Sequence, residues 1–170
     1  LHFFFFFLMQ VGSLDRAVML MSTAIELNPQ YTASYCNRGL ALKRLSRFKD
    51  SLADFDMAIA LSPSLVQAHF NKGLLLYHQG HPQEAVASFD TAINLDPDNA
   101  DLYNLRGKAL AHVNLIEEAL ANFETAIRLN PSHVDAYNNQ GNVLLDLRRL
   151  DDALASYDKS ISLKSDDSAI

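Results

Sequence analysis

Apolar residues recur at intervals of three and four along most of the chain. Between residues 14 and 27 they occupy positions 14, 17, 18, 21, 24 and 25, which form one face of a helix. An Asn-Pro pair at 28–29 ends this segment, because the residue before a proline avoids the α region. The same pattern predicts eight further helices, at about 33–45, 48–61, 67–79, 82–95, 101–112, 116–129, 135–147 and 150–163.

The pattern returns every 34 residues. Glycines at 39, 73, 107 and 141 and prolines at 29, 63, 97 and 131 all keep this interval. A fixed period of this length is typical of repeat architectures, in which each unit is one supersecondary element. The sequence therefore predicts an array of helix pairs, two helices to a repeat.

The spacing resembles that of the tetratricopeptide repeat (TPR) family. Each repeat has an aromatic residue, then glycine, alanine, a second aromatic residue, alanine and proline, matched in full by Tyr103, Gly107, Ala119, Phe123, Ala126 and Pro131. The departures from this pattern are His69, Ser51, Ser160 and Ser165. The resemblance implies an all-α solenoid, a right-handed superhelix of antiparallel helix hairpins. It extends to the TPR arrays of O-linked N-acetylglucosamine transferase-like proteins and of bacterial TPR proteins.

The predicted organisation is one continuous array. A partial or degenerate repeat at 1–31 precedes four repeats at 32–65, 66–99, 100–133 and 134–167. Isoleucines at 25, 59, 93, 127 and 161 are expected to pack onto the next repeat, so that stability sums over neighbours. No C-terminal capping helix is visible, and we expect the apolar face of 150–163 to be open.

Residues 1–11 depart from the pattern, because the polar face is absent. The apolar run from Phe3 to Met9 is shorter than the ~20 residues that span a bilayer. Neither a basic segment nor a small-residue cleavage site marks a complete signal peptide. We expect a terminal helix that packs on the first repeat; the alternatives are the tail of a signal or anchor and a self-association surface. Because the chain does not begin with methionine, it looks like a fragment.

Composition narrows the classes of partner. The net charge is −6 and like charges are not clustered, which argues against a nucleic-acid surface. The single cysteine, Cys36, excludes an internal disulfide and a multi-cysteine metal site, and is expected to be a small packing or groove-lining residue. No stable membrane span is predicted. The compartment is left open, with the cytoplasm slightly favoured.

The candidate catalytic groups have simpler explanations. Carboxylates stand at the equivalent positions 50, 84, 118 and 152, where the helix dipole favours them, so these acidic residues are expected to be structural. His78 and His112 are also period-equivalent, but a third metal ligand is missing and a groove contact is expected instead. Motifs for nucleophilic catalysis and phosphate binding are absent. We therefore expect no enzymatic activity, no metal and no cofactor.

The resemblance implies that the first helix of each repeat lines an inner, concave groove. The family positions that face the groove map onto Asn37, Leu40, Lys43, Arg44, Phe70, Asn71, Leu74, Tyr77, His78, Asn104, Lys108, His112, Asn138, Asn139 and Asn142.

Asparagines recur within this set. Asn37, Asn71 and Asn139 are period-equivalent, and only Leu105 interrupts the series. Side-chain amides can donate to and accept from an extended peptide backbone without reading its side chains. The series resembles the asparagine ladder of O-linked N-acetylglucosamine transferases. The alternative is that asparagine is merely tolerated on an exposed helix face.

A second TPR subset grips a C-terminal carboxylate with lysine, asparagine and arginine at set positions. Those positions hold Cys36, Leu40, Asp101 and Leu105 here, so this clamp is not expected. The predicted function is a non-catalytic scaffold that binds a peptide or partner helix in the groove, its partner a protein of unknown identity. The alternatives are the substrate-selecting TPR fragment of a larger enzyme, such as a glycosyltransferase, and a module that self-assembles through uncapped ends.

Overall fold

The computed structural model describes residues 2–167 of the 170-residue chain, and this part is helical with no strand. The all-α TPR-type fold expected from the sequence is confirmed. In chain order the helices are α1 (His2–Gln10), α2 (Leu14–Leu27), α3 (Thr32–Arg44), α4 (Phe48–Leu61), α5 (Val66–His78), α6 (Pro82–Leu95), α7 (Ala100–His112), α8 (Ile116–Leu129), α9 (Val134–Asp146) and α10 (Leu150–Asp167).

The helix ends follow the sequence closely. From α2 to α9 each observed end lies within one residue of the predicted one. The exception is α10, which runs to Asp167 and not to residue 163. At the equivalent point the other repeats have a proline, whereas this one has Ser165, which leaves the helical hydrogen-bond ladder intact.

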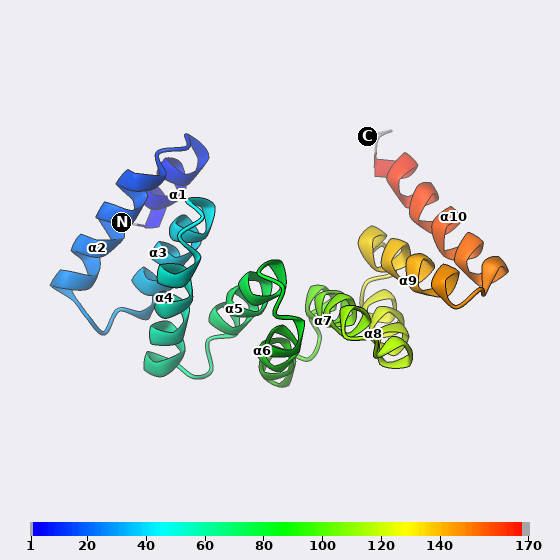
Figure 1. Cartoon of the computed structure of the whole chain (residues 1–170). Helices are drawn as coiled ribbons and strands as arrows, with labels where there is room; N and C mark the ends of the chain where they lie inside the picture. The colour runs from blue at the N-terminus through cyan, green and yellow to red at the C-terminus, as the bar shows by residue number, and fades with distance from the viewer. Residues whose placement is uncertain (1, 168–170) are drawn as a thin grey trace. The chain divides into compact units, whose positions relative to one another are not determined.

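The chain divides into two compact units, residues 1–79 and 80–170. The N-terminal unit contains α1–α5 and the C-terminal unit contains α6–α10, and within each unit consecutive helices follow one another through short loops (Figure 1). We describe each unit by itself.

Two groups of buried side chains hold the N-terminal unit together. Phe5 and Met21 belong to the first, which joins α1 to α2 and α3. Tyr35 and Ala68 belong to the second, where Ile59 of α4 packs against it. The expected terminal helix at 1–11 is therefore present, and it contributes a fully buried aromatic ring to the core.

In the C-terminal unit an apolar cluster joins neighbouring helices. Leu110, Leu120, Phe123 and Val143 bring α7, α8 and α9 together. On α10, Ile161 is 62 % exposed, whereas the equivalent Ile93 of α6 is 8 % exposed. The isoleucine position is thus buried in α6 and open in α10, as expected for the apolar face of 150–163.

Close glycine–aromatic contacts set the distance between the two helices of a hairpin. A Cβ added at Gly39 would lie 2.7 Å from a ring carbon of Phe55, and one at Gly107 would lie 2.6 Å from Phe123. Such distances are shorter than real Cβ contacts. Glycine is required here because the ring occupies the space of a side chain.

The partial repeat uses a different combination at these positions. Counting back by the period, Phe5 stands where the other repeats have glycine, and Met21 stands where they have the second aromatic residue. Both are buried. The large ring therefore comes from the first helix in this repeat and from the second helix in the others.

Each hairpin turn contains one residue in the left-handed region. Gly12, Ser46, Gly80, Asn114 and Arg148 have φ values between 59° and 81° and are spaced by the repeat period. The sequence did not reveal this position, because only two of its five residues are glycine.

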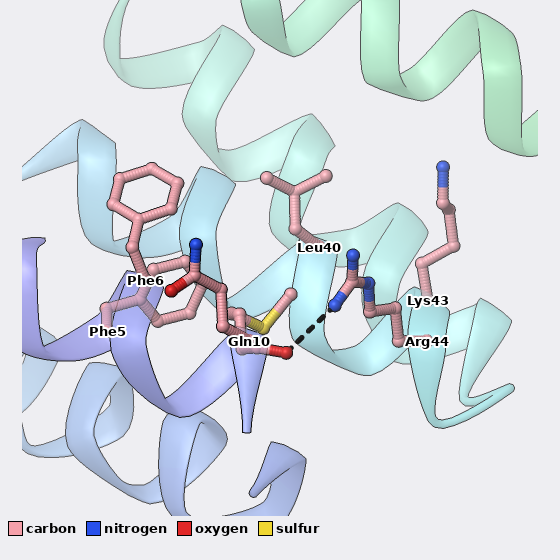
Figure 2. Close-up of a pocket in the computed structure, with 7 residues that line it drawn as sticks. Phe5, Phe6, Gln10, Leu40, Lys43 and Arg44 are labelled. Atoms are coloured by element: carbon pink, nitrogen blue, oxygen red, sulfur yellow. Dashed lines mark hydrogen bonds between the residues drawn. The ribbon is translucent and has the colours of Figure 1, made fainter. Parts of the chain in front are cut away.

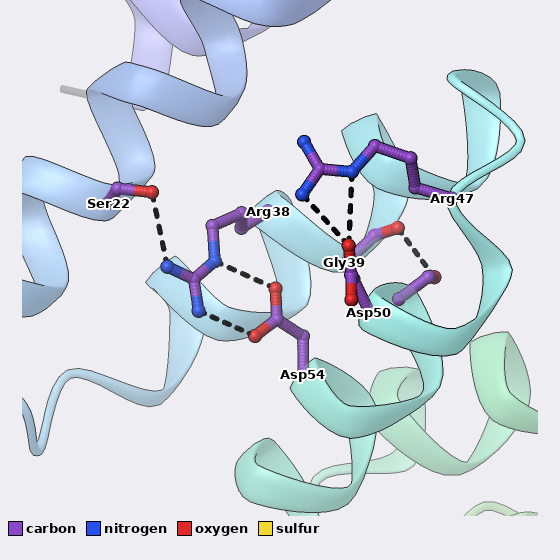
Figure 3. A network of polar contacts seen from close by, with 7 residues as sticks. Ser22, Arg38, Gly39, Arg47, Asp50 and Asp54 are labelled. Carbon is purple, nitrogen blue, oxygen red and sulfur yellow. Dashed lines mark hydrogen bonds and ion pairs between the residues drawn. The ribbon is translucent and has the colours of Figure 1, made fainter.

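Ion pairs join neighbouring helices at one position of the first helix (Figure 3). The guanidinium of Arg38 donates to both carboxylate oxygens of Asp54 at 2.8 and 2.7 Å, and to Ser22 Oγ at 3.1 Å. The equivalent Lys72 lies 2.7 Å from Asp56, on the helix that precedes it. Arg106 likewise pairs with Asp90 of the preceding helix, at 2.8 Å in the C-terminal unit.

The residues that depart from the TPR pattern find polar partners. Ser51 Oγ donates to the carbonyl of Gly39 at 2.7 Å, and His69 Nε2 lies 2.8 Å from the carbonyl of Pro63. Both side chains are buried. Their hydrogen bonds explain why polar residues are tolerated at packing positions.

Candidate peptide-binding surface

In the N-terminal unit the first helices α1 and α3 line a half-open cavity of about 480 Å³ (Figure 2). Three predicted groove residues, Leu40, Lys43 and Arg44, line it from α3. Four residues of α1 complete the lining, and none of them was predicted: Phe5, Phe6, Met9 and Gln10. The repeat period places residues 1–11 at the position of a first helix, and this is the sequence signal from which these lining residues could have been predicted.

The cavity is apolar on one side and positively charged on the other. Arg44 Nη1 donates a 3.0 Å hydrogen bond to the carbonyl of Met9, which ties the end of α3 to α1. Burial, followed by the charge of Arg44, lowers the pKa of Lys43. Within the described residues, neither cation has a carboxylate within ion-pair distance. The site therefore holds two adjacent positive charges beside apolar side chains.

The asparagine positions in this unit are buried. Asn37 and Asn71 are both less than a tenth exposed. Among the described residues, Asn71 Nδ2 has no hydrogen-bond partner. Cys36 is also buried, and desolvation together with the charge of Asp54 raises the pKa of its thiol to about 11. A neutral, buried thiol is a poor nucleophile, which agrees with a packing role.

The remaining predicted residues of the N-terminal unit lie along α5. Phe70, Leu74 and Tyr77 are half-buried and His78 is exposed. The rings of Tyr77 and His78 meet edge to face, with centroids 5.9 Å apart, and burial raises the pKa of Tyr77.

In the C-terminal unit a hydrogen bond joins two predicted asparagines. Asn139 Nδ2 of α9 donates to Asn104 Oδ1 of α7 at 2.8 Å. Nearby, His133 Nδ1 accepts from the backbone N–H of Ala136, while its Nε2 lies 3.1 Å from Asp101 of α7. The Asn139–Asn104 and His133–Asp101 contacts hold α9 and α7, the first helices of successive repeats, side by side.

The other predicted residues of this unit are accessible to solvent. Lys108 and Asn138 are half-buried, and His112 and Asn142 are exposed. Asn142 Oδ1 accepts a 2.8 Å hydrogen bond from the hydroxyl of Tyr157.

The acidic residues of the second helices make local pairs. Arg47 bonds to Asp50 and Arg149 bonds to Asp152, each at 2.8 Å and one helical turn apart. Over residues 2–167, no three His, Cys, Asp or Glu side chains are grouped so that they could hold a metal ion. In the same part of the chain, every helix is too short or too polar to cross a membrane.

Comparison with solved structures identifies several similar folds. The 41-end piece of MamA from Desulfovibrio magneticus RS-1 superposes with a TM-score of 0.89 at 18 % identity, covering 97 % of this chain and 93 % of that one. YrrB, described as a TPR protein with an unusual peptide-binding site, gives 0.79 at 24 % identity, with coverages of 96 % and 84 %. PilF from Pseudomonas aeruginosa gives 0.86 at 19 % identity, with coverages of 94 % and 72 %. At these identities the likeness concerns the fold.

Comparison of the sequence with known proteins and with protein-family models shows which family the chain belongs to. No curated protein matches the chain significantly. The model of the tetratricopeptide repeat family matches residues 36–100, 70–114 and 104–168, which together cover most of the chain. Repeats of this family act as protein-interaction modules. The chain belongs to the tetratricopeptide repeat family.

Proposed function

We propose that this chain is a non-catalytic interaction scaffold that binds a peptide or partner helix along its first helices. The observation that carries the proposal is the cavity between α1 and α3, in which three groove positions inferred from the repeat pattern meet. Its volume, about 480 Å³, lies within the range of small-ligand pockets, and its apolar walls with a few polar groups suit side-chain recognition. The peptide-binding site described for YrrB, whose fold is similar, agrees with such a role.

Peptide selection combined with photocrosslinking tests this proposal. Peptides selected from a random displayed library would be bound to two variants of the protein, each carrying a photoreactive benzoylphenylalanine. One replaces Leu74, on the first helix α5, and the other replaces Met57, which is exposed on the second helix α4. We expect crosslinks from position 74 only. Crosslinks from position 57 alone, or a library that yields no binder, would contradict the proposal.

The asparagines would have different roles in binding. Among the described residues Asn71 Nδ2 has no hydrogen-bond partner but is buried, so it is a donor for a peptide carbonyl only after its side chain turns toward the groove. Asn139 already donates to Asn104. Asn71→Leu should therefore weaken peptide binding while leaving stability nearly unchanged. Asn139→Ala should lower the free energy of unfolding by about 1–3 kcal/mol, because it leaves a buried amide oxygen unsatisfied.

Urea unfolding and peptide titration of the two asparagine variants separate these effects. Equal stability losses in both variants would contradict the assigned roles.

Self-association is a second candidate, favoured by the exposed phenylalanines of α1. Phe3 is 87 % exposed, and the exposed rings of Phe4 and Phe7 stack with centroids 6.3 Å apart. Apolar patches of this kind are typical of interaction sites. Sedimentation of the wild-type chain and of a Phe3→Ser/Phe7→Ser variant tests this. A wild-type monomer at high concentration would rule the candidate out.

A further inference from the structure

The cations of the α1–α3 cavity differ from three other cations on the first helices in their carboxylate partners. Arg38, Lys72 and Arg106 each lie against a carboxylate at 2.7 or 2.8 Å. Lys43 and Arg44 have no such partner among the described residues, although they are adjacent in sequence and face the same cavity. This site therefore has an excess of positive charge in a chain whose net charge is −6.

The surroundings of these cations limit what can neutralise them. The other lining residues are Phe5, Phe6, Met9, Gln10 and Leu40, none of which is acidic. One guanidinium nitrogen of Arg44 donates to the Met9 carbonyl, and a guanidinium has five N–H donors, so further donors are left for a ligand. Figure 2 shows Lys43 and Arg44 together at one side of the pocket and Phe6 at the other, with Leu40 between them.

An apolar wall beside two cations fits a ligand with the opposite arrangement. We propose that the cavity binds an extended acidic peptide segment in which a large apolar side chain is flanked by aspartate or glutamate. The apolar side chain lies against Met9, Leu40 and Phe6. The flanking carboxylates pair with Lys43 and Arg44. This inference rests on the proposed scaffold function and names the class of peptide that the scaffold takes.

The amide of Gln10 gives the site a means to hold a peptide rather than another amphiphile. It lines the same cavity and can both donate to and accept from a peptide bond. The carboxylate of a fatty-acid-like amphiphile can accept from this amide but offers no donor to its oxygen, whereas a peptide bond supplies both an acceptor and a donor. Partial burial of Lys43 also strengthens its pairing with a carboxylate, because such a pair is screened less than an exposed one.

A binding assay with a defined peptide tests the inference. The probe is a fluorescein-labelled peptide, Gly-Asp-Glu-Leu-Glu-Asp-Gly with an amidated C-terminus, and its analogue Gly-Asn-Gln-Leu-Gln-Asn-Gly lacks the charges. Fluorescence anisotropy should show that the acidic peptide binds at least about tenfold more tightly than the analogue. Its affinity should fall as the salt concentration rises.

Two protein variants assign the effect to the cavity. Lys43→Gln/Arg44→Gln should weaken binding of the acidic peptide by about tenfold or more. Arg16→Gln/Lys49→Gln removes the same charge from exposed positions of α2 and α4, and should change the affinity less than about twofold. Leu40→Trp fills the cavity without a charge change and should also abolish binding. Far-UV circular dichroism checks that each variant is folded.

Several outcomes would overturn the inference. Equal binding of the acidic and uncharged peptides, or full binding by the Lys43→Gln/Arg44→Gln variant, would show that the cations do not select the ligand. Binding of decanoate with the same dependence on both variants, without binding of the peptide, would assign the site to an amphiphilic carboxylate. If the acidic peptide does not bind but library peptides crosslink at position 74, this inference fails and the scaffold function stands.

Discussion

Substitution of Gly107 by alanine would test how tightly the two helices of a repeat are packed. The added Cβ would lie 2.6 Å from Phe123 Cε1 and 3.0 Å from two further ring carbons. Phe123 is 1 % exposed and packs among Leu110, Leu120 and Val143, so its ring has little room to move. The strain must therefore be met by movement of the helix backbones.

Two opposing effects decide how much Gly107→Ala changes the free energy of unfolding. Alanine is favoured over glycine in a helix by about 1 kcal/mol. Overpacking of a well-packed core costs about 1–3 kcal/mol, and the burial of Phe123 argues for the upper part of this range. We expect Gly107→Ala to lower the free energy of unfolding by about 1–2 kcal/mol.

A matched substitution at Gly141 isolates the contribution of the ring. A Cβ at Gly141 would lie 2.7 Å from Tyr157, but this ring is only half-buried. The gain in helix propensity is the same at both positions. We therefore expect Gly141→Ala to change stability by less than about 1 kcal/mol.

Urea unfolding followed by circular dichroism at 222 nm would measure both variants. The double variant Gly107→Ala/Phe123→Leu provides a further check, because the shorter leucine leaves space for the new methyl group. It should be more stable than the sum of the single changes predicts, by about 1–2 kcal/mol. If Gly107→Ala equals or exceeds the stability of the wild type, the close contact does not constrain the hairpin and the reasoning is wrong.

Three further predictions concern other sites. The pKa of Cys36 is about 11 in the folded protein, against an ordinary value of 9.0. The neutral thiol therefore contributes to the free energy of unfolding in full below pH 9, and this contribution is lost as the pH rises to 11. Urea unfolding of the wild type and of Cys36→Ala across this pH range would measure the loss. Arg38→Met should lower the free energy of unfolding by about 3 kcal/mol, because it leaves Asp54 buried without its partner. Arg106→Met should lower it by at most about 1 kcal/mol, because its ion pair with Asp90 is partly exposed. Thermal unfolding would rank the two variants. Ser46→Gly should raise the free energy of unfolding by up to about 1 kcal/mol because φ is 59° there, and a destabilised variant would contradict this.

The fold could be predicted from the sequence because its packing depends on residue size at a fixed interval. Gly107 and Phe123 mark where two helices approach, and each proline marks the end of a repeat. The extension of α10 beyond residue 163 was not predicted, since the repeat period alone places the helix end there and Ser165 carries no helix signal of its own. The left-handed turn residues were missed because Ser46 and Arg148 carry no glycine signal.

The candidate site could be predicted only in part. The period located Leu40, Lys43 and Arg44 on α3, but an apolar run without a polar face gave no sign that Phe6 and Gln10 would line a cavity with them. The hydrogen-bonded asparagines of α7 and α9 belong to different positions of the repeat, so the register alone did not pair them.

The ion pairs that reach back to the preceding helix bear on how such an array can lengthen. Asp56 and Lys72 are separated by 16 residues, as are Asp90 and Arg106, which is less than half of one 34-residue period. A tandem duplication of residues 66–99 would place the copied Lys72 16 positions after Asp90, and the copied Asp90 16 positions before Arg106. Every new junction would inherit a cation and its carboxylate at the correct spacing. Gene duplication could therefore change the number of repeats without leaving a charge unpaired between them.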